Sequence, residues 1–181
     1  MNKSYRFWLF CTLVLLGVIS RWLPHPPNFT PLMAIALFSG ALFQNRYWAL
    51  AVPLLAMFIS DLGFGFHDQM WPIYLSLTVA VGIGRWVGNQ GKALSSLAKR
   101  LPMGILSSSV LFFVLSNLSV WAFSGIYPIN GSGLLECYLM AIPFFQTEIL
   151  SNLFYSGLLF GVWVAICKWA PAEWTGLVRR H

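Results

Sequence analysis

Long apolar segments, interrupted only by short polar connections, restrict the folds open to this chain. Only 9% of its 181 residues are charged and 58% are hydrophobic, whereas a soluble domain carries about 25% charged residues. So few charged side chains could not cover the surface of a water-soluble fold. The sequence therefore predicts an integral membrane protein, and its length predicts a single membrane domain over residues 1–181.

Six segments are apolar enough to be predicted as membrane spans. Helices are expected because each span must satisfy its own backbone hydrogen bonds in lipid. The predicted spans are 7–22, 31–43, 47–60, 70–84, 103–123 and 139–167. A full crossing needs roughly 20 residues, so the sequence leaves open whether the short second segment crosses fully, and the long sixth segment is expected to tilt or to break at Pro143. The expected fold is an all-α bundle of six transmembrane helices.

The basic residues predict how these spans are oriented. In the six-span topology ten of the eleven Lys and Arg residues fall on one side, and only Arg21 falls on the other. Lys and Arg are concentrated on the cytoplasmic side of membrane proteins. Both termini are therefore expected in the cytoplasm. No basic run with interleaved aromatic residues indicates a nucleic-acid partner.

The opposite, outer side carries polar residues of a different kind. Its three connections cover residues 21–30, 61–69 and 124–138 and hold three of the five acidic residues and two of the three histidines. The inner side offers little besides positive charge. We therefore expect a ligand site, if the chain has one, on the outer side.

The first outer connection is unusually rich in proline and reads LPHPPNFTP. Proline fixes its own φ and keeps the preceding residue out of the helical region, so this connection is predicted to be stiff. A stiff connection can hold His25, Asn28 and Thr30 in place with little loss of entropy on binding. We interpret it as the rigid edge of a lid over a substrate cavity. The alternative is a plain helix-to-helix connection with Pro31 in the first turn of the next helix.

Asp61 lies where the third span is expected to leave the membrane. A carboxylate at that depth is costly unless it is paired or hydrated, and Arg21 is the predicted partner. The alternative is a helix cap beside an interfacial belt of aromatic residues. His67 and Asp68 follow closely. Of the possible groups of metal-ligating side chains in the sequence, Asp61, His67 and Asp68 come nearest to a metal site, although no metal site is predicted.

Glu148 is the only acidic residue deep within a predicted span. Ionisable groups inside membranes are candidates for functional sites, and Asn152 shares the same helix face. The alternative is a polar contact between helices. At the outer end of the fifth span, Trp121 precedes a connection that carries Tyr127 and Asn130. We expect these three residues to face the same site.

Small residues recur every four positions in two predicted spans, which predicts close packing of helices there. They are Ala80, Gly84 and Gly88 in the fourth span, and Gly157, Gly161 and Ala165 in the sixth. The sequence contains no nucleotide-binding loop, no HExxH, no GxSxG and no metal-spaced cysteine or histidine set. No cofactor is predicted.

Three runs of the sequence resemble a family of small bacterial membrane proteins of uncharacterised function. They are RWLPHPPNFTPLMAIALFSGALF, SDLGFGFHD and YPINGSGLLECYLMAIPFF, and the resemblance extends over roughly residues 6 to 168. That family is in turn similar to the substrate-binding S components of energy-coupling-factor (ECF) vitamin transporters. The similarity lies in size, six spans, inner termini and polar outer connections.

The resemblance implies a six-helix bundle in the inner (plasma) membrane of a bacterium that binds a vitamin-like molecule near its outer face. The three outer connections would line and close the pocket, and a separate scaffold with two ATPases would move the substrate. The first span lacks the Ala-x-x-x-Ala pattern with which many S components dock that scaffold. The chain either docks through other small residues, such as Gly17, or works alone, as solitary relatives do.

We therefore expect the substrate-binding membrane component of an importer for a vitamin or cofactor precursor, and not an enzyme. Its partners would be the small-molecule substrate, the lipid bilayer, and either ECF scaffold and ATPase subunits or none. The expected substrate-binding residues are His25, Asn28, Phe29, Thr30, Asp61, His67, Trp121, Tyr127, Asn130 and Glu148. Two alternatives stay open: an outer-leaflet membrane enzyme that uses the His and Asp residues of the connections, and a non-catalytic membrane scaffold.

Overall fold

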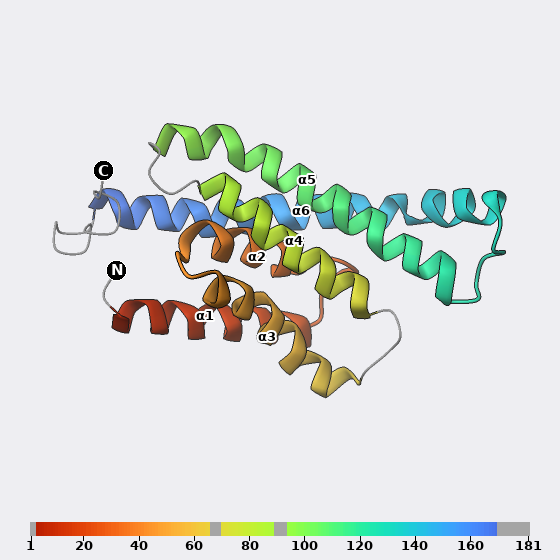
Figure 1. Ribbon diagram of the computed structural model, residues 1–181, viewed down its shortest axis with the longest axis horizontal. Helices are drawn as coiled ribbons and strands as arrows, with labels where there is room; N and C mark the ends of the chain where they lie inside the picture. The colour runs from red at the N-terminus through yellow and green to blue at the C-terminus, as the bar shows by residue number, and fades with distance from the viewer. Residues whose placement is uncertain (1–2, 66–69, 89–93, 170–181) are drawn as a thin grey trace.

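The computed structural model describes residues 3–65, 70–88 and 94–169, and all regular structure within these ranges is helical. Figure 1 shows the bundle that the helices form. The helices are α1 (Lys3–Trp22), α2 (Leu32–Leu42), α3 (Arg46–Phe64), α4 (Met70–Gly88), α5 (Leu94–Phe123) and α6 (Gly131–Trp169). The prediction of an all-α fold is confirmed for the described residues.

Four of these helices are long and apolar enough to cross a membrane. They are α1, α3, α5 and α6, over Ser4–Trp22, Arg46–Phe64, Ser96–Phe123 and Gly131–Lys168. The 39 residues of α6 continue through Pro143 without a break and correspond to about 58 Å at 1.5 Å per residue. A bilayer core is about 30 Å thick. The α5–α6 hairpin accordingly extends past the ends of α1, α3 and α4 in Figure 1.

The second helix is short and lies at the centre of the bundle. The 11 residues of α2 correspond to about 16 Å, roughly half of a bilayer core. Every residue from Leu32 to Ala41 is buried, and α2 packs against α3, α4 and α6. A helix that is apolar on all sides is suited to such a position, and LMAIALFSGAL has that composition. The structure therefore describes a half-length central helix where the sequence predicted a short span.

Close approach between α2 and α4 depends on glycine. A Cβ at Gly84 would overlap the carbonyl oxygen of Leu37, and a Cβ at Gly88 would overlap that of Ala41. Any larger residue would force the two backbones apart, so these positions require glycine. The predicted packing role of the small residues in the fourth span is confirmed.

The corresponding prediction for the sixth span is wrong. A Cβ added at Gly157 or Gly161 would meet no atom within 4 Å, and both residues lie on an exposed face of α6. The four-residue spacing is present there, but none of the described helices packs against that side of α6.

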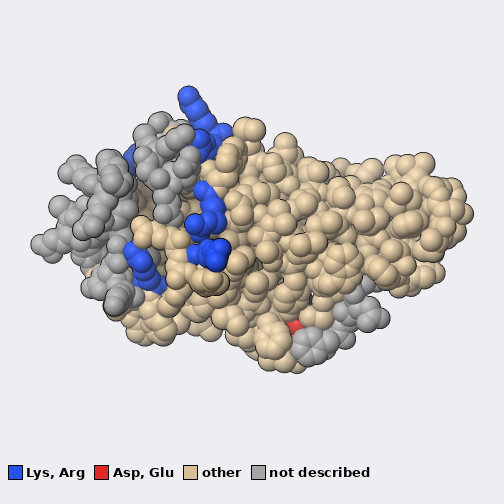
Figure 2. Space-filling view, in the orientation of Figure 1, with Lys and Arg blue, Asp and Glu red and all other residues tan. Residues whose placement is uncertain are grey.

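Basic side chains gather at one end of the bundle, as Figure 2 shows. This end carries the first residue of α1 and the last residue of α6 (Figure 1). Arg6 of α1 donates to Gln44 Oε1 over 3.5 Å, and Arg85 of α4 donates to the carbonyl oxygens of Phe43 and Gln44 over 3.3 and 3.4 Å. These bonds connect α1 and α4 to the short connection between α2 and α3. Both described ends of the chain thus lie on the basic side.

Candidate functional site

The connection between α1 and α2 contains a tight turn built by its prolines. The amide N–H of Phe29 donates to the Pro26 carbonyl oxygen over 3.0 Å. Pro27 is the second residue of this turn, and Asn28 is the third with a φ of 62°. Proline followed by a residue with positive φ is typical of a type II turn, and asparagine tolerates that conformation well. The unusual run PPNF therefore specifies the shape of the connection.

The same connection is attached to the middle of α6 rather than to either of its ends. Ser151 Oγ donates to the Thr30 carbonyl oxygen over 2.9 Å. The ring of Phe29 lies 5.7 Å from that of Tyr155 and 6.3 Å from that of Phe154, measured between centroids. Since Ser151 is close to the midpoint of Gly131–Trp169, the connection dips into the bundle. It delivers the first turn of α2 to a buried position.

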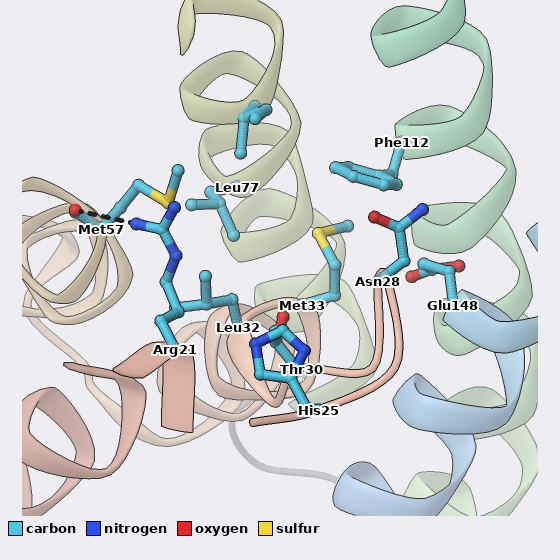
Figure 3. Close-up of a pocket in the computed structure, with 11 residues that line it drawn as sticks. Arg21, His25, Asn28, Thr30, Leu32, Met33, Met57, Leu77, Phe112 and Glu148 are labelled. Carbon is cyan, nitrogen blue, oxygen red and sulfur yellow. Dashed lines mark hydrogen bonds between the residues drawn. The ribbon is translucent and has the colours of Figure 1, made fainter. Parts of the chain in front are cut away.

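A cavity of about 190 Å³ lies where this connection meets the bundle (Figure 3). All six helices and the connection contribute to its wall. The lining residues are Arg21, His25, Asn28, Thr30, Leu32, Met33, Met57, Ile73, Leu77, Phe112 and Glu148. His25 and Asn28 are exposed, so they mark the open side of the cavity. The remaining wall is mainly aliphatic, thioether and aromatic.

Glu148 is the buried acidic group of this cavity. Its exposed fraction is 4%, and within the described residues neither carboxylate oxygen has a hydrogen-bond partner of standard geometry. The hydroxyl of Ser109 on α5 is its polar neighbour. Buried polar groups are normally satisfied, and an exception needs an explanation. Figure 3 shows the carboxyl group beside Asn28, on the cavity side of α6.

The turn of α6 that follows Glu148 fixes its position against α5. Asn152 Nδ2 donates to the hydroxyl oxygens of Ser108 and Ser109, each over 3.0 Å. Asn152 Oδ1 accepts from Ser156 over 3.2 Å. Asn152 and the three serines are buried, so this network is rigid and well satisfied. One face of α6 therefore holds the carboxylate, the connection and α5 in a fixed arrangement.

Arg21 lies on the opposite side of the cavity from Glu148 (Figure 3) and is held by α3. Its Nη1 donates to Asp61 Oδ1 over 2.5 Å, to Ser60 Oγ, and to the Met57 carbonyl oxygen over 3.4 Å. Tyr74 donates to the second oxygen of Asp61 over 2.8 Å. Asp61 is 1% exposed, so the predicted pairing of this buried carboxylate with Arg21 is confirmed.

The two carboxylates are therefore in different electrostatic states. Asp61 has a cation and a hydroxyl donor, which together offset its burial. Glu148 has no cation among the described residues within hydrogen-bonding distance. Arg21 is already paired, so the cavity has an uncompensated acidic side. The basic side of the cavity is the paired guanidinium of Arg21, whose Nη2 and Nε donate to no described residue.

The predicted site residues divide into four groups, the last of which lies in the connection between α5 and α6. His25, Asn28, Thr30 and Glu148 line the cavity. Phe29 and Asp61 lie next to it, where Phe29 packs on α6 and Asp61 holds Arg21. His67 lies outside the described residues.

Trp121, Tyr127 and Asn130 are not among the residues that line the cavity. Trp121 donates its ring N–H to the Pro128 carbonyl oxygen over 3.0 Å. Asn130 Oδ1 accepts from the amide N–H of Gly133 over 2.9 Å and stabilises the start of α6. These contacts organise the connection between α5 and α6, to which Tyr127 also belongs. A ligand role for these three residues stays a prediction.

Sequence reasoning missed most of the apolar wall. Leu32, Met33, Met57, Ile73, Leu77 and Phe112 lie within apolar helices, and nothing in their spacing separates a cavity wall from a lipid-facing or packed surface. Within the described ranges, no group of three or more His, Cys, Asp or Glu side chains is arranged to hold a metal ion.

Comparison with known proteins gives a family for the chain. Residues 1–173 match the profile described as a family of unknown function, DUF6580. The chain belongs to the DUF6580 family. Neither the curated proteins nor the solved structures yield a significant match. The match covers α1 to α6 and therefore every residue that lines the cavity.

Proposed function

We propose that this chain is the substrate-binding membrane component of a small-molecule importer, with an architecture like that of an ECF S component. The observation that carries the proposal is the cavity that all six helices line, with the buried carboxylate of Glu148, which has no cationic partner among the described residues, in its wall. Binding pockets are concave, mostly apolar and provided with a few placed polar groups. This cavity has that composition.

A binding role accounts for the wall better than a catalytic role. Covalent catalysis by the protein's own groups needs a nucleophilic side chain within hydrogen-bonding reach of a base. The Arg21 guanidinium is held by Asp61, and the carboxylate oxygens of Glu148 have neither a nucleophile nor a base as a hydrogen-bond partner of standard geometry among the described residues. Such groups are suited to holding a ligand that is released unchanged.

The proposed topology places both termini in the cytoplasm of a bacterium and the chain in its inner membrane. The gathering of basic side chains at one end of the bundle (Figure 2) supports this orientation. The α1–α2 connection would then enter from the outer side and turn back at mid-depth, and α2 would lead to the inner face. Non-helical backbone is tolerated at such depth where protein buries it or where it lines a cavity.

Energy for import would come from outside this chain, because its sequence contains no nucleotide-binding loop. We expect either an ECF scaffold with ATPase subunits or a solitary mode of action. In both cases the chain itself supplies recognition. The residues proposed for recognition are Glu148 and Arg21 in the wall, with His25, Asn28 and Thr30 at the open side.

Native mass spectrometry of the protein, purified gently from its own host, tests the proposal. We expect a co-purifying small molecule of unchanged mass on release, and its loss in the double variant His25→Ala, Asn28→Ala. The variant Glu136→Gln, on an exposed position of α6, is the control and should keep the molecule. A bare protein that no compound of a vitamin panel stabilises against heat would overturn the proposal and favour a scaffold. A chemically altered product would favour an enzyme.

A further inference from the structure

We infer that the ligand of this cavity is a small organic cation whose protonated amine binds the carboxylate of Glu148. The inference rests on the proposed function and adds the chemical class of the substrate. It starts from the burial of Glu148, which is 4% exposed and has no hydrogen-bond partner of standard geometry among the described residues. A buried ionised carboxylate is costly without a counter-charge and donors. A bound ammonium group supplies both.

The basic side chains already in the cavity wall do not fill this role. Arg21 donates to Asp61 over 2.5 Å and to the Met57 carbonyl oxygen over 3.4 Å, and it lies across the cavity from Glu148 in Figure 3. His25 is exposed, and its Nδ1 lies 2.9 Å from the Pro26 carbonyl oxygen. The carboxylate therefore faces the cavity without a positive partner among the residues that the structure describes.

The surroundings of Glu148 favour a cation over a neutral donor. Phe112 lies on the same side of the cavity as Glu148 (Figure 3), and an aromatic face attracts a desolvated cation. Asn28, beside the carboxyl group, brings an amide that can accept or donate a further hydrogen bond. The methionine and leucine side chains beyond them suit an apolar or aromatic body.

The size of the cavity limits the ligand to a small molecule. Its volume of about 190 Å³ corresponds to about six water molecules at liquid density. Typical drug-sized pockets occupy about 300–1,000 Å³. A single aromatic ring that carries an aminomethyl group is of suitable size, whereas a nucleotide is not. Nη2 and Nε of Arg21 donate to no described residue, so an acceptor at the far end of the ligand would find donors there.

Binding of three matched single-ring compounds tests the inference. Benzylamine, benzyl alcohol and benzoate differ in the group that would meet Glu148, which is a cation, a neutral hydroxyl or an anion. Their dissociation constants are measured by calorimetry at pH 7 on the full-length protein in detergent, washed until native mass spectrometry shows it bare. We expect benzylamine to bind and the other two to bind at least about ten-fold more weakly, the difference made by one charged hydrogen bond.

Two variants locate the binding. Glu148→Gln should weaken benzylamine about ten- to hundred-fold, while Glu136→Gln on the exposed face of α6 should leave it unchanged. Equal affinity for amine and alcohol would overturn the inference, since Glu148 would then act as a neutral donor. Failure of benzylamine to bind, or undiminished binding to Glu148→Gln, would overturn it as well. If Glu148→Gln does not fold, the comparison of the three compounds on the wild-type protein decides the inference by itself.

The inference and the proposed function fail in different ways. A co-purifying molecule that lacks a basic nitrogen would contradict the inference and leave the binding role intact. If the protein carries no molecule and binds no compound of the vitamin panel, both the proposed function and the inference are contradicted.

Discussion

Arg21 of α1 and Asp61 of α3 form an ion pair, with 2.5 Å between Nη1 and Oδ1, at the wall of the cavity. Asp61 is 1% exposed, and Tyr74 of α4 donates to its second oxygen over 2.8 Å. Three helices therefore meet at one carboxylate. Because Asp61 does not itself line the cavity, its role is to fix the guanidinium that does.

Removal of one partner of this pair should destabilise the fold strongly. Asp61→Asn leaves Arg21, 17% exposed, without its counter-charge, and we expect a loss of about 3 kcal/mol in the free energy of unfolding. Thermal unfolding in detergent measures it. The double variant Arg21→Met, Asp61→Leu replaces the pair by apolar side chains and should lose less. An Asp61→Asn protein that unfolds at the wild-type temperature would contradict a structural role for the pair.

Glycine at the α2–α4 contact should not tolerate even one methyl group. A Cβ at Gly84 overlaps the Leu37 backbone, so Gly84→Ala must separate the helices, and we expect a loss of about 1–3 kcal/mol. Gly82 lies on the same helix with no atom within 4 Å of an added Cβ. Gly82→Ala should therefore unfold at or slightly above the wild-type temperature. Equal unfolding temperatures for both variants would show that α2 and α4 separate without cost.

Asn152 is expected to contribute more to stability than an exposed polar residue of the same helix. Asn152→Leu removes the donor to Ser108 and Ser109, and it leaves the buried Ser156 hydroxyl without the acceptor Asn152 Oδ1. We expect a loss of about 1–3 kcal/mol, measured by thermal unfolding. Gln146 is exposed on α6, and Gln146→Leu should have little effect. A stable Asn152→Leu protein would indicate that the α5–α6 contact is held by apolar packing alone.

Because Asn28 has a positive φ of 62°, we expect two substitutions at this position to differ in their effect on stability. Asn28→Gly keeps the turn, because glycine adopts this conformation without strain, whereas Asn28→Val should cost about 1–2 kcal/mol. Differential scanning fluorimetry separates the two. If both variants have the same unfolding temperature, the turn does not constrain the connection.

The proposed orientation is tested by labelling single cysteines from outside the cell. Cys11, Cys137 and Cys167 are first replaced by alanine. A cysteine at Ile129, exposed in the α5–α6 connection, should react with a membrane-impermeant maleimide in intact spheroplasts. A cysteine at Gln44, exposed between α2 and α3, should react only after lysis. The reverse pattern would invert the topology and move the cavity to the cytoplasmic side.

Helix positions and charged groups were predictable from the sequence, because their signals are local. Apolar runs located all six helices, and the cost of burying Asp61 indicated its pairing with Arg21. Glu148 stood out as the acidic residue deep in a span. The glycines at 84 and 88 were predicted as packing positions from their spacing, although the same spacing failed at Gly157 and Gly161.

The depth of the first connection could not be predicted in this way. Hydropathy gives the order of segments along the chain but not the level at which Thr30 meets Ser151 of α6. Nor does it separate Met57, which lines the cavity, from other apolar residues of the same helix. Those features depend on contacts between residues far apart in sequence.

The half-length of α2 also has a consequence for the order in which the protein is assembled. A segment of about 16 Å cannot hold itself across a bilayer core of about 30 Å, so α2 has no stable place in lipid until neighbouring helices surround it. The long helices can insert first and associate afterwards, as helices in membranes do. The packing of α2 against Gly84 and Gly88 of α4 is then a late step of assembly. Since Leu32 and Met33 complete the wall, the cavity itself is formed only when that step is finished.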